Sequence, residues 1–138
     1  MKDIVLTFKN ELRNYNHLKK QLESIHDRLD VLWYELTGVK GVDASKERGG
    51  YGTDDKKMEI SGKIDRLEEE KKRIEMEISY INKVLQLMPR EVQSACILIY
   101  ARGEKFSKVA MNTYRSVGSL QRLIDSNIEQ ALNRYRYR

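Results

Sequence analysis

Apolar residues recur at alternating steps of three and four over two long stretches, which is the spacing of a heptad seam on an α-helix. The first seam consists of Tyr15, Leu18, Leu22, Ile25, Leu29, Leu32 and Leu36, extended backwards by Phe8 and Leu12 and widened near its end by Val31, Trp33 and Tyr34. The second consists of Ile60, Ile64, Leu67, Lys71, Ile74, Ile78, Ile81, Leu85 and Met88, with Lys71 as its single polar member. Two such helices joined by one loop are expected to fold back as a long antiparallel coiled-coil hairpin.

The segment between the seams, residues 38–57, is rich in glycine and polar side chains and predicts a connection that begins where Gly38 ends the first helix. It lacks the Gly-Lys-Ser/Thr ending of a phosphate-binding loop and follows no predicted strand. Two interpretations stay open. The segment is either a flexible hairpin loop or a loop that contacts a partner protein or DNA through Val39, Val42 and Tyr51.

Three shorter apolar stripes between residues 87 and 132 predict three helices separated by two brief breaks. Pro89 suits the first turn of a helix, where its missing N–H costs nothing. Gly103 is free to take the left-handed conformation of a helix C-cap, and Ser116 is a candidate N-cap. The residues expected to face inward are Val92, Cys96, Ile99, Tyr100, Phe106, Val109, Ala110, Leu120, Leu123, Ile124, Ile128, Ala131 and Leu132.

The last two of these helices have the spacing of a helix-turn-helix. Ala110 is small where a large side chain would push the helices apart, and Ser116 starts the next helix six residues later. Tyr114 stands where such turns customarily have glycine, and Asn112 is a second candidate for the left-handed turn position. We therefore predict an all-α protein with a hairpin over residues 1–86 and a small C-terminal helix-turn-helix domain over residues 87–138.

The segment Leu-Met-Pro-Arg-Glu-Val at residues 87–92, followed by Gly103 and this helix spacing, resembles region 4 of bacterial sigma factors. In length and layout the chain also resembles small phage-encoded transcriptional activators of the late-operon and autolysin-regulator type. The resemblance implies promoter DNA as the ligand, an activating role and a bacterial host cell. Sigma region 4 has a basic and an acidic residue where this chain has Val117 and Gly118, so a different target sequence is expected.

The charge distribution supports a polyanionic partner. Residues 89–138 carry nine basic and four acidic side chains, whereas the rest of the chain is close to neutral and the whole has a net charge of +5. Phosphate attraction and counterion release would therefore draw DNA to the C-terminal segment. Cys96 is the only cysteine, which predicts a reducing cytoplasm, and no apolar run is long enough to suggest a membrane span.

If the last helix enters a major groove, its early solvent-facing side chains contact the bases. Gln121 can pair with adenine, and Arg122 with guanine or a phosphate. The predicted DNA-binding residues are Arg102, Lys105, Lys108, Arg115, Ser116, Val117, Ser119, Gln121 and Arg122, with Asp125 and Ser126 further along the same face. The alternating arginines and tyrosines of residues 134–138 are either further contacts to the DNA backbone or a frayed, solubilising tail.

The sequence offers no arrangement of residues that is typical of an enzyme. His17 and His26 are too far apart for a helical metal pair and are expected at the surface, and Cys96 lies in an apolar stripe without a histidine nearby. Residues 68–73, three glutamates followed by Lys71, Lys72 and Arg73, are expected to form a solvated helix face with pairs such as Glu68–Lys72 and Glu69–Arg73. We expect no catalytic residues, no metal and no cofactor.

The favoured hypothesis is a sequence-specific DNA-binding transcriptional regulator, a phage or prophage late-gene activator, that forms a homodimer through the coiled coil and has host RNA polymerase as a further candidate partner. The alternative is a protein-interaction adaptor that engages RNA polymerase or another protein without binding DNA. A structural phage component ranks last, because a helix-turn-helix would have no role there.

Overall fold

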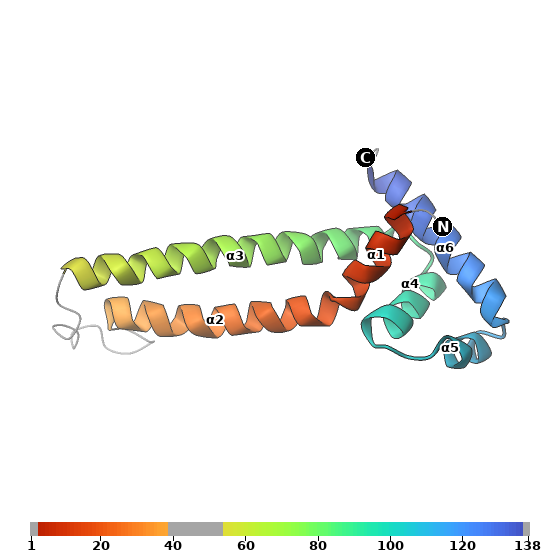
Figure 1. Ribbon diagram of the computed structural model, residues 1–138, viewed down its shortest axis with the longest axis horizontal. Helices are drawn as coiled ribbons and strands as arrows, with labels where there is room; N and C mark the ends of the chain where they lie inside the picture. Colours follow the sequence, from red (N-terminus) through yellow and green to blue (C-terminus); the bar gives the residue numbers. More distant parts are fainter. Residues whose placement is uncertain (1–2, 39–53, 137–138) are drawn as a thin grey trace. The chain divides into compact units, whose positions relative to one another are not determined.

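In the computed structural model the protein is described over residues 3–38 and 54–136, and these residues form helices joined by short turns (Figure 1). The predicted all-α class is therefore confirmed. The helices are α1 (Asp3–Arg13), α2 (Tyr15–Thr37), α3 (Asp54–Gln86), α4 (Arg90–Cys96), the π-helical segment η3 (Ile97–Ala101), α5 (Phe106–Asn112) and α6 (Val117–Arg136).

The predicted loop, residues 38–57, is only partly described. Gly38 ends α2 with a positive φ of 73°, as expected for a helix stop, and its N–H donates to the Tyr34 carbonyl at 2.7 Å. Helix α3 already begins at Asp54, so the connection is shorter than predicted. Val39, Val42 and Tyr51, on which the choice between a hairpin loop and a contact loop depends, lie outside the described residues.

The chain divides into two compact units, and each is described by itself. Unit 1 comprises Met1–Leu18 and Glu77–Arg138, and unit 2 comprises Lys19–Met76. This grouping differs from the predicted boundary between residues 86 and 87. The physical reason is that α1 and the last turns of α3 pack with the C-terminal helices, with Phe8 and Ile81 almost completely buried there.

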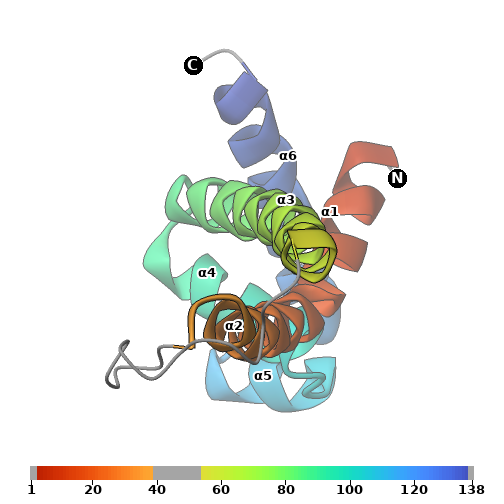
Figure 2. The same ribbon diagram turned by 90° about the vertical axis from the view of Figure 1, so that its left-hand side faces the viewer.

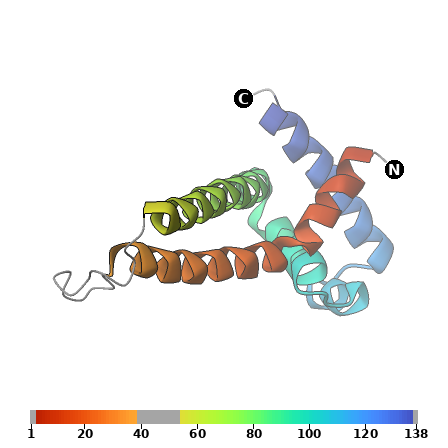
Figure 3. The ribbon, with the colours of Figure 1, turned by 60° about the vertical axis from the view of Figure 1, so that its left-hand side comes forward.

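Unit 2 is a pair of helices. The parts of α2 and α3 within it lie side by side and run in opposite directions (Figures 1 and 3). The seam residues Ile25, Leu29, Ile60, Ile64, Leu67 and Ile74 are buried. Val31, Trp33 and Tyr34, which were expected to widen the seam, are instead exposed over 40–53% of their surface. That part of the prediction is wrong.

The core of unit 1 gathers apolar side chains from every helix that contributes to it. They are Val5, Phe8, Leu12, Ile81, Val84, Leu85, Met88, Val92, Ala95, Cys96, Ile99, Tyr100, Val109, Ala110, Leu120, Ile124, Ile128 and Ala131. Burying a side chain of the size of isoleucine or leucine contributes about 1.5–3 kcal/mol, so this core is the main source of stability in unit 1. Most of the inward-facing residues predicted between residues 87 and 132 lie in it.

Helix α1 is separate from α2, although the sequence predicted one seam through both. The break lies at Asn14, whose N–H is shared between the carbonyls of Asn10 and Glu11 at 3.2 Å each. Phe8 and Leu12 of α1 lie in the core of unit 1, where neither has any exposed surface. The sequence was right that Phe8 and Leu12 lie on a helix, but wrong that they continue the seam of α2.

A π-helical turn follows α4, which the sequence did not reveal. The N–H of Arg102 donates to the carbonyl of Ile97, five residues back, and the N–H of Glu104 donates to that of Leu98, both at 2.9 Å. Gly103 lies between these donors with a φ of 74°, the left-handed conformation predicted for it. Pro89 is the residue before the first turn of α4, one position earlier than predicted.

Candidate nucleic-acid interface

Helices α5 and α6 are joined by a tight turn, and α6 extends from that turn to the far end of unit 1 (Figures 1 and 2). The small side chain of Ala110 on α5 is 2% exposed, and that of Leu120 on α6 is 1% exposed, so both lie in the core of unit 1.

The turn itself is a Schellman motif, the usual hydrogen-bonded ending of a helix. The N–H of Arg115 donates to the Ala110 carbonyl at 2.9 Å, and the N–H of Tyr114 donates to the Met111 carbonyl at 3.1 Å. Tyr114 occupies the left-handed position, with a φ of 58°, where glycine is usual. The choice left open by the sequence therefore falls on Tyr114, while Asn112 stays within α5.

The first two turns of α6 present an open face. The Ser116 hydroxyl accepts a hydrogen bond from the Ser119 N–H at 3.1 Å, which confirms its predicted role as N-cap. Gln121 and Arg122 are exposed. One guanidinium nitrogen of Arg122 lies 3.4 Å from the point where a Cβ on Gly118 would be, so the missing side chain gives Arg122 room to extend back over the start of the helix.

Most of the predicted DNA-binding side chains are open to solvent. Seven are exposed, namely Arg102, Lys105, Lys108, Ser116, Val117, Gln121 and Arg122. Arg115 and Ser119 are half-buried. They come from the end of η3, from α5 and the residue before it, from the turn and from the start of α6, which the chain path brings to one end of unit 1 (Figure 2).

Two of the basic side chains have carboxylate partners. Lys108 Nζ lies 3.0 Å from Glu104 Oε1, and Arg115 Nε lies 3.5 Å from Glu91 Oε1. Exposed pairs of this kind contribute about 0–1 kcal/mol, so a phosphate can compete for either cation. Within the described residues Arg122 has no carboxylate partner of this kind.

Asp125, which the sequence placed further along the exposed face, has 38% of its side chain exposed and also forms an ion pair with α1. Its Oδ1 lies 2.5 Å from Nζ of Lys9, a side chain that is 8% exposed and therefore buried. The same ammonium lies 5.6 Å from the centre of the Tyr100 ring, within cation–π range. Lys9 was missed because nothing in its local sequence marks it as buried. Its ion pair joins α1 to α6 at Asp125, beyond the exposed first two turns of α6.

The end of α6 is also more ordered than a frayed tail. The Tyr135 ring packs edge-on against Tyr80, with 5.2 Å between centroids, and Tyr80 in turn meets Phe8 at 6.2 Å. Arg134 and Arg136 are exposed, whereas Tyr137 and Arg138 lie outside the described residues. Tyr135 is thus a packing residue and not part of a frayed tail, whereas a contact of the exposed arginines with the DNA backbone stays a prediction.

Burial in the core of unit 1 favours the neutral forms of Cys96 and Tyr100. Burial raises the pKa of the Cys96 thiol to about 12, and burial likewise raises the pKa of Tyr100. Cys96 is fully buried, as predicted for a packing residue, and His17 and His26 are exposed. Over residues 3–38 and 54–136, no three His, Cys, Asp or Glu side chains lie together as metal ligands.

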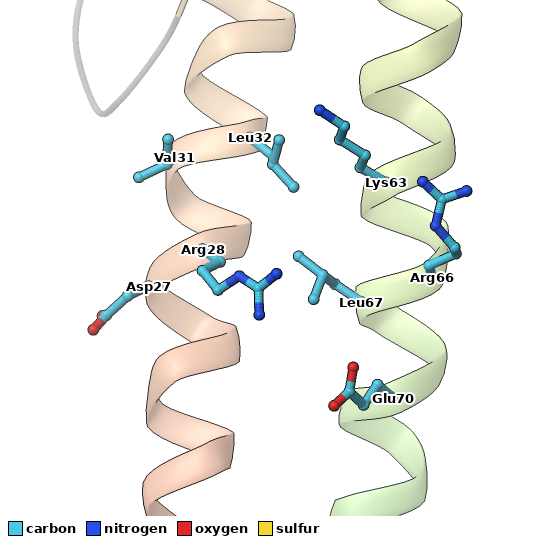
Figure 4. Close-up of a pocket in the computed structure, with 8 residues that line it drawn as sticks. All are labelled: Asp27, Arg28, Val31, Leu32, Lys63, Arg66, Leu67 and Glu70. Atoms are coloured by element: carbon cyan, nitrogen blue, oxygen red, sulfur yellow. The ribbon is translucent and has the colours of Figure 1, made fainter.

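Unit 2 carries a groove of its own between α2 and α3. Leu32 and Leu67 face one another across it, while Arg28 and Glu70 reach in from opposite helices and Asp27 points away (Figure 4). Val31, Lys63 and Arg66 complete its lining. Charged side chains of both signs, Arg28, Lys63, Arg66, Asp27 and Glu70, lie around this groove.

No helix in the described parts of the chain has the length and apolar character needed to cross a bilayer. None of the protein-family models, curated proteins and solved structures with which the chain was compared matches it.

Proposed function

We propose that this chain is a sequence-specific DNA-binding transcriptional regulator in which α5, the turn at Tyr114 and α6 act as a helix-turn-helix. The observation that carries the proposal is the open start of α6. Gln121 and Arg122 are exposed there, and the ion pair that joins α1 to α6 lies about one turn further along, at Asp125. A helix end whose exposed face carries hydrogen-bond donors such as Gln121 and Arg122 suits a DNA major groove.

The charge around this helix supports the same ligand. Arg102, Lys105, Lys108 and Arg115 flank the turn, and the N-terminus of α6 adds the positive end of a helix dipole. Cations at the rim fix the register through phosphates, whereas side chains on the recognition helix distinguish bases. We assign Gln121 to adenine, and Arg122 to guanine or to a phosphate beside it.

The biological role follows the resemblance. Small phage-encoded activators with a sigma-like module act on promoters in the bacterial cytoplasm, and we propose an activating role for this chain on that basis. Host RNA polymerase would then be a second partner at the promoter.

Unit 2 is proposed to mediate dimerisation as a coiled-coil hairpin. The seam residues Ile25, Ile64 and Ile74 are already buried within one chain, so the contact between copies has to use other side chains. Val31 and Tyr34 are exposed apolar residues available for it. Light scattering gives the subunit number, and a dimer predicts a target of two half-sites.

The function is tested by fluorescence anisotropy with labelled duplexes from host and phage promoters at several salt concentrations. We expect Arg122→Ala to weaken binding by about 1–3 kcal/mol and Lys108→Ala to lower the salt slope by about 1. Lys20→Ala, an exposed change in unit 2, is the control and should change neither quantity. Equal affinities for all three variants and the unaltered chain would refute the site.

The second candidate function is an adaptor that engages RNA polymerase without binding DNA. It is favoured by the exposed apolar side chains Met111, Tyr114 and Val117, which gather near the turn. Polymerase capture by a chain that binds no promoter duplex would establish this function in place of the first.

A further inference from the structure

Tyr114 combines a strained backbone with an almost fully exposed side chain. Its φ of 58° lies in the left-handed region, where residues other than glycine and asparagine are uncommon. The Schellman hydrogen bonds fix this conformation, because Tyr114 supplies one of their two donors. Glycine at this position would form the same turn without strain.

In the part of the chain that the structure describes, the tyrosine ring makes no packing contact that would stabilise the fold of unit 1. The side chain is 96% exposed, and within the described residues it takes part in no hydrogen bond, ring contact or ion pair. A strained residue whose side chain makes no internal contact is a candidate for an external one, since strain persists where function requires it. The position therefore points to a ligand that the ring or its hydroxyl touches.

The neighbours of Tyr114 indicate the chemistry of that ligand. Lys105, Lys108 and Met111 follow at intervals of three from the residue before α5 and share a face that leads to the turn. Arg115 comes next in the chain, and the start of α6 carries Arg122. Cations on both sides of one exposed phenol favour a polyanion, because a phosphate can compete for Lys108 and Arg115 with their carboxylate partners, whereas an apolar protein surface would only desolvate these charges.

We propose that Tyr114 is a DNA-backbone contact whose hydroxyl donates a hydrogen bond to a phosphate oxygen, with the ring against the adjoining sugar. Tyrosine hydroxyls are among the neutral donors that proteins use on phosphates. This inference rests on the proposed function and adds a residue that positions the duplex without adding charge. The strain at Tyr114 then trades stability of the free protein for affinity.

Two substitutions separate this role from a structural one. Tyr114→Gly relieves the backbone and should raise the thermal midpoint by about 3 °C, yet it should weaken duplex binding at least tenfold. Tyr114→Phe keeps the strain and the ring, so the midpoint should stay while affinity falls about tenfold through the lost hydroxyl. Because no cation is removed, the salt slope of both variants should match that of the unaltered chain.

The measurement is anisotropy of a labelled promoter duplex over a range of salt, with calorimetry for the midpoint and Arg122→Ala as a reference. If Arg122→Ala weakens binding and both Tyr114 variants bind as the unaltered chain does, this inference is overturned while the proposed function stands. If the unaltered chain binds no duplex, both are overturned. If Tyr114→Gly reduces capture of RNA polymerase but leaves the duplex affinity unchanged, the turn serves a protein partner and the inference is again overturned.

Discussion

Buried Lys9 and half-exposed Asp125 form an ion pair that joins α1 to α6, the helix proposed to contact DNA. The ammonium and carboxylate lie 2.5 Å apart, and Lys9 is 8% exposed. Asp125 comes one turn after Gln121 on α6, so the pair holds the helix just beyond its open end. The N-terminal helix is thereby part of the support for the candidate interface.

Removing the ammonium should cost stability. Lys9→Met keeps most of the aliphatic stem but leaves the Asp125 oxygen without its partner. A broken buried pair costs about 3–5 kcal/mol, and we expect about 2 kcal/mol in urea denaturation because 38% of the Asp125 side chain is still exposed. Lys20→Met, at an exposed site, is the control. The double variant Lys9→Met/Asp125→Met should recover most of the lost free energy of unfolding, because no buried charge is then left without a partner. If Lys9→Met alone lowers the free energy of unfolding by less than about 0.5 kcal/mol, the ion pair does not stabilise the fold.

Cys96 should be inert in the folded protein. Burial raises its thiol pKa to about 12 and leaves no exposed surface, so the reactive thiolate is scarce at pH 8 and out of reach. A chromogenic disulfide reagent should label it only after denaturant is added, at the rate of unfolding. Rapid labelling of the native chain would show that the packing of α4 in unit 1 is looser than described.

Glu11 should make stability depend on pH in an unusual direction. Burial, and secondly the nearby Glu77 carboxylate, raise its pKa above the ordinary 4.5. The folded state therefore favours the protonated form, and the ionised carboxylate opposes folding at neutral pH; the penalty fades as pH falls through the raised pKa towards 4.5.

The variant Glu11→Gln should consequently have a higher thermal midpoint than the unaltered chain at pH 7, and the difference should vanish near pH 4. Glu23→Gln on the exposed face of α2 is the matched control and should shift the midpoint little at either pH. An equal gain at both pH values would assign the effect to something other than ionisation.

Two substitutions of the N-cap residue Ser116 separate effects on the stability of the protein from effects on duplex binding. Ser116→Ala removes the acceptor for the Ser119 N–H and should lower the free energy of unfolding by about 1 kcal/mol. Ser116→Asp keeps a good cap and the stability, but it brings a negative charge to the proposed phosphate contacts and should weaken duplex binding. Undiminished affinity of the aspartate variant would place the DNA elsewhere.

Local pattern predicted much of this fold because the helices obey it. The seam of α3, the inward residues of α4, α5 and α6, the cap at Ser116 and the stop at Gly103 all depend on neighbours within a few residues. Such features are visible in sequence because spacing and residue type decide them.

What the sequence missed depends on contacts between distant segments. The bend at Asn14 leaves the heptad spacing intact, so only the packing of α1 on α6 reveals it. From its sequence neighbours Lys9 would be expected in solvent, and only the folded structure brings it into contact with Asp125 and the Tyr100 ring. The exposure of Gln121 and Arg122 on α6 could be predicted from helical spacing, whereas the left-handed conformation of Tyr114 could not be chosen over Asn112 without the backbone.

The central claim, that the open start of α6 meets a duplex, is tested most directly by titrating isotope-labelled protein with promoter DNA and following backbone amide NMR signals. We predict that the largest shifts fall at the turn and the first two turns of α6, from Met111 to Arg122, and that unit 2 is little affected. Shifts confined to residues 19–76, or none in the α5–α6 segment at saturating DNA, would contradict the account.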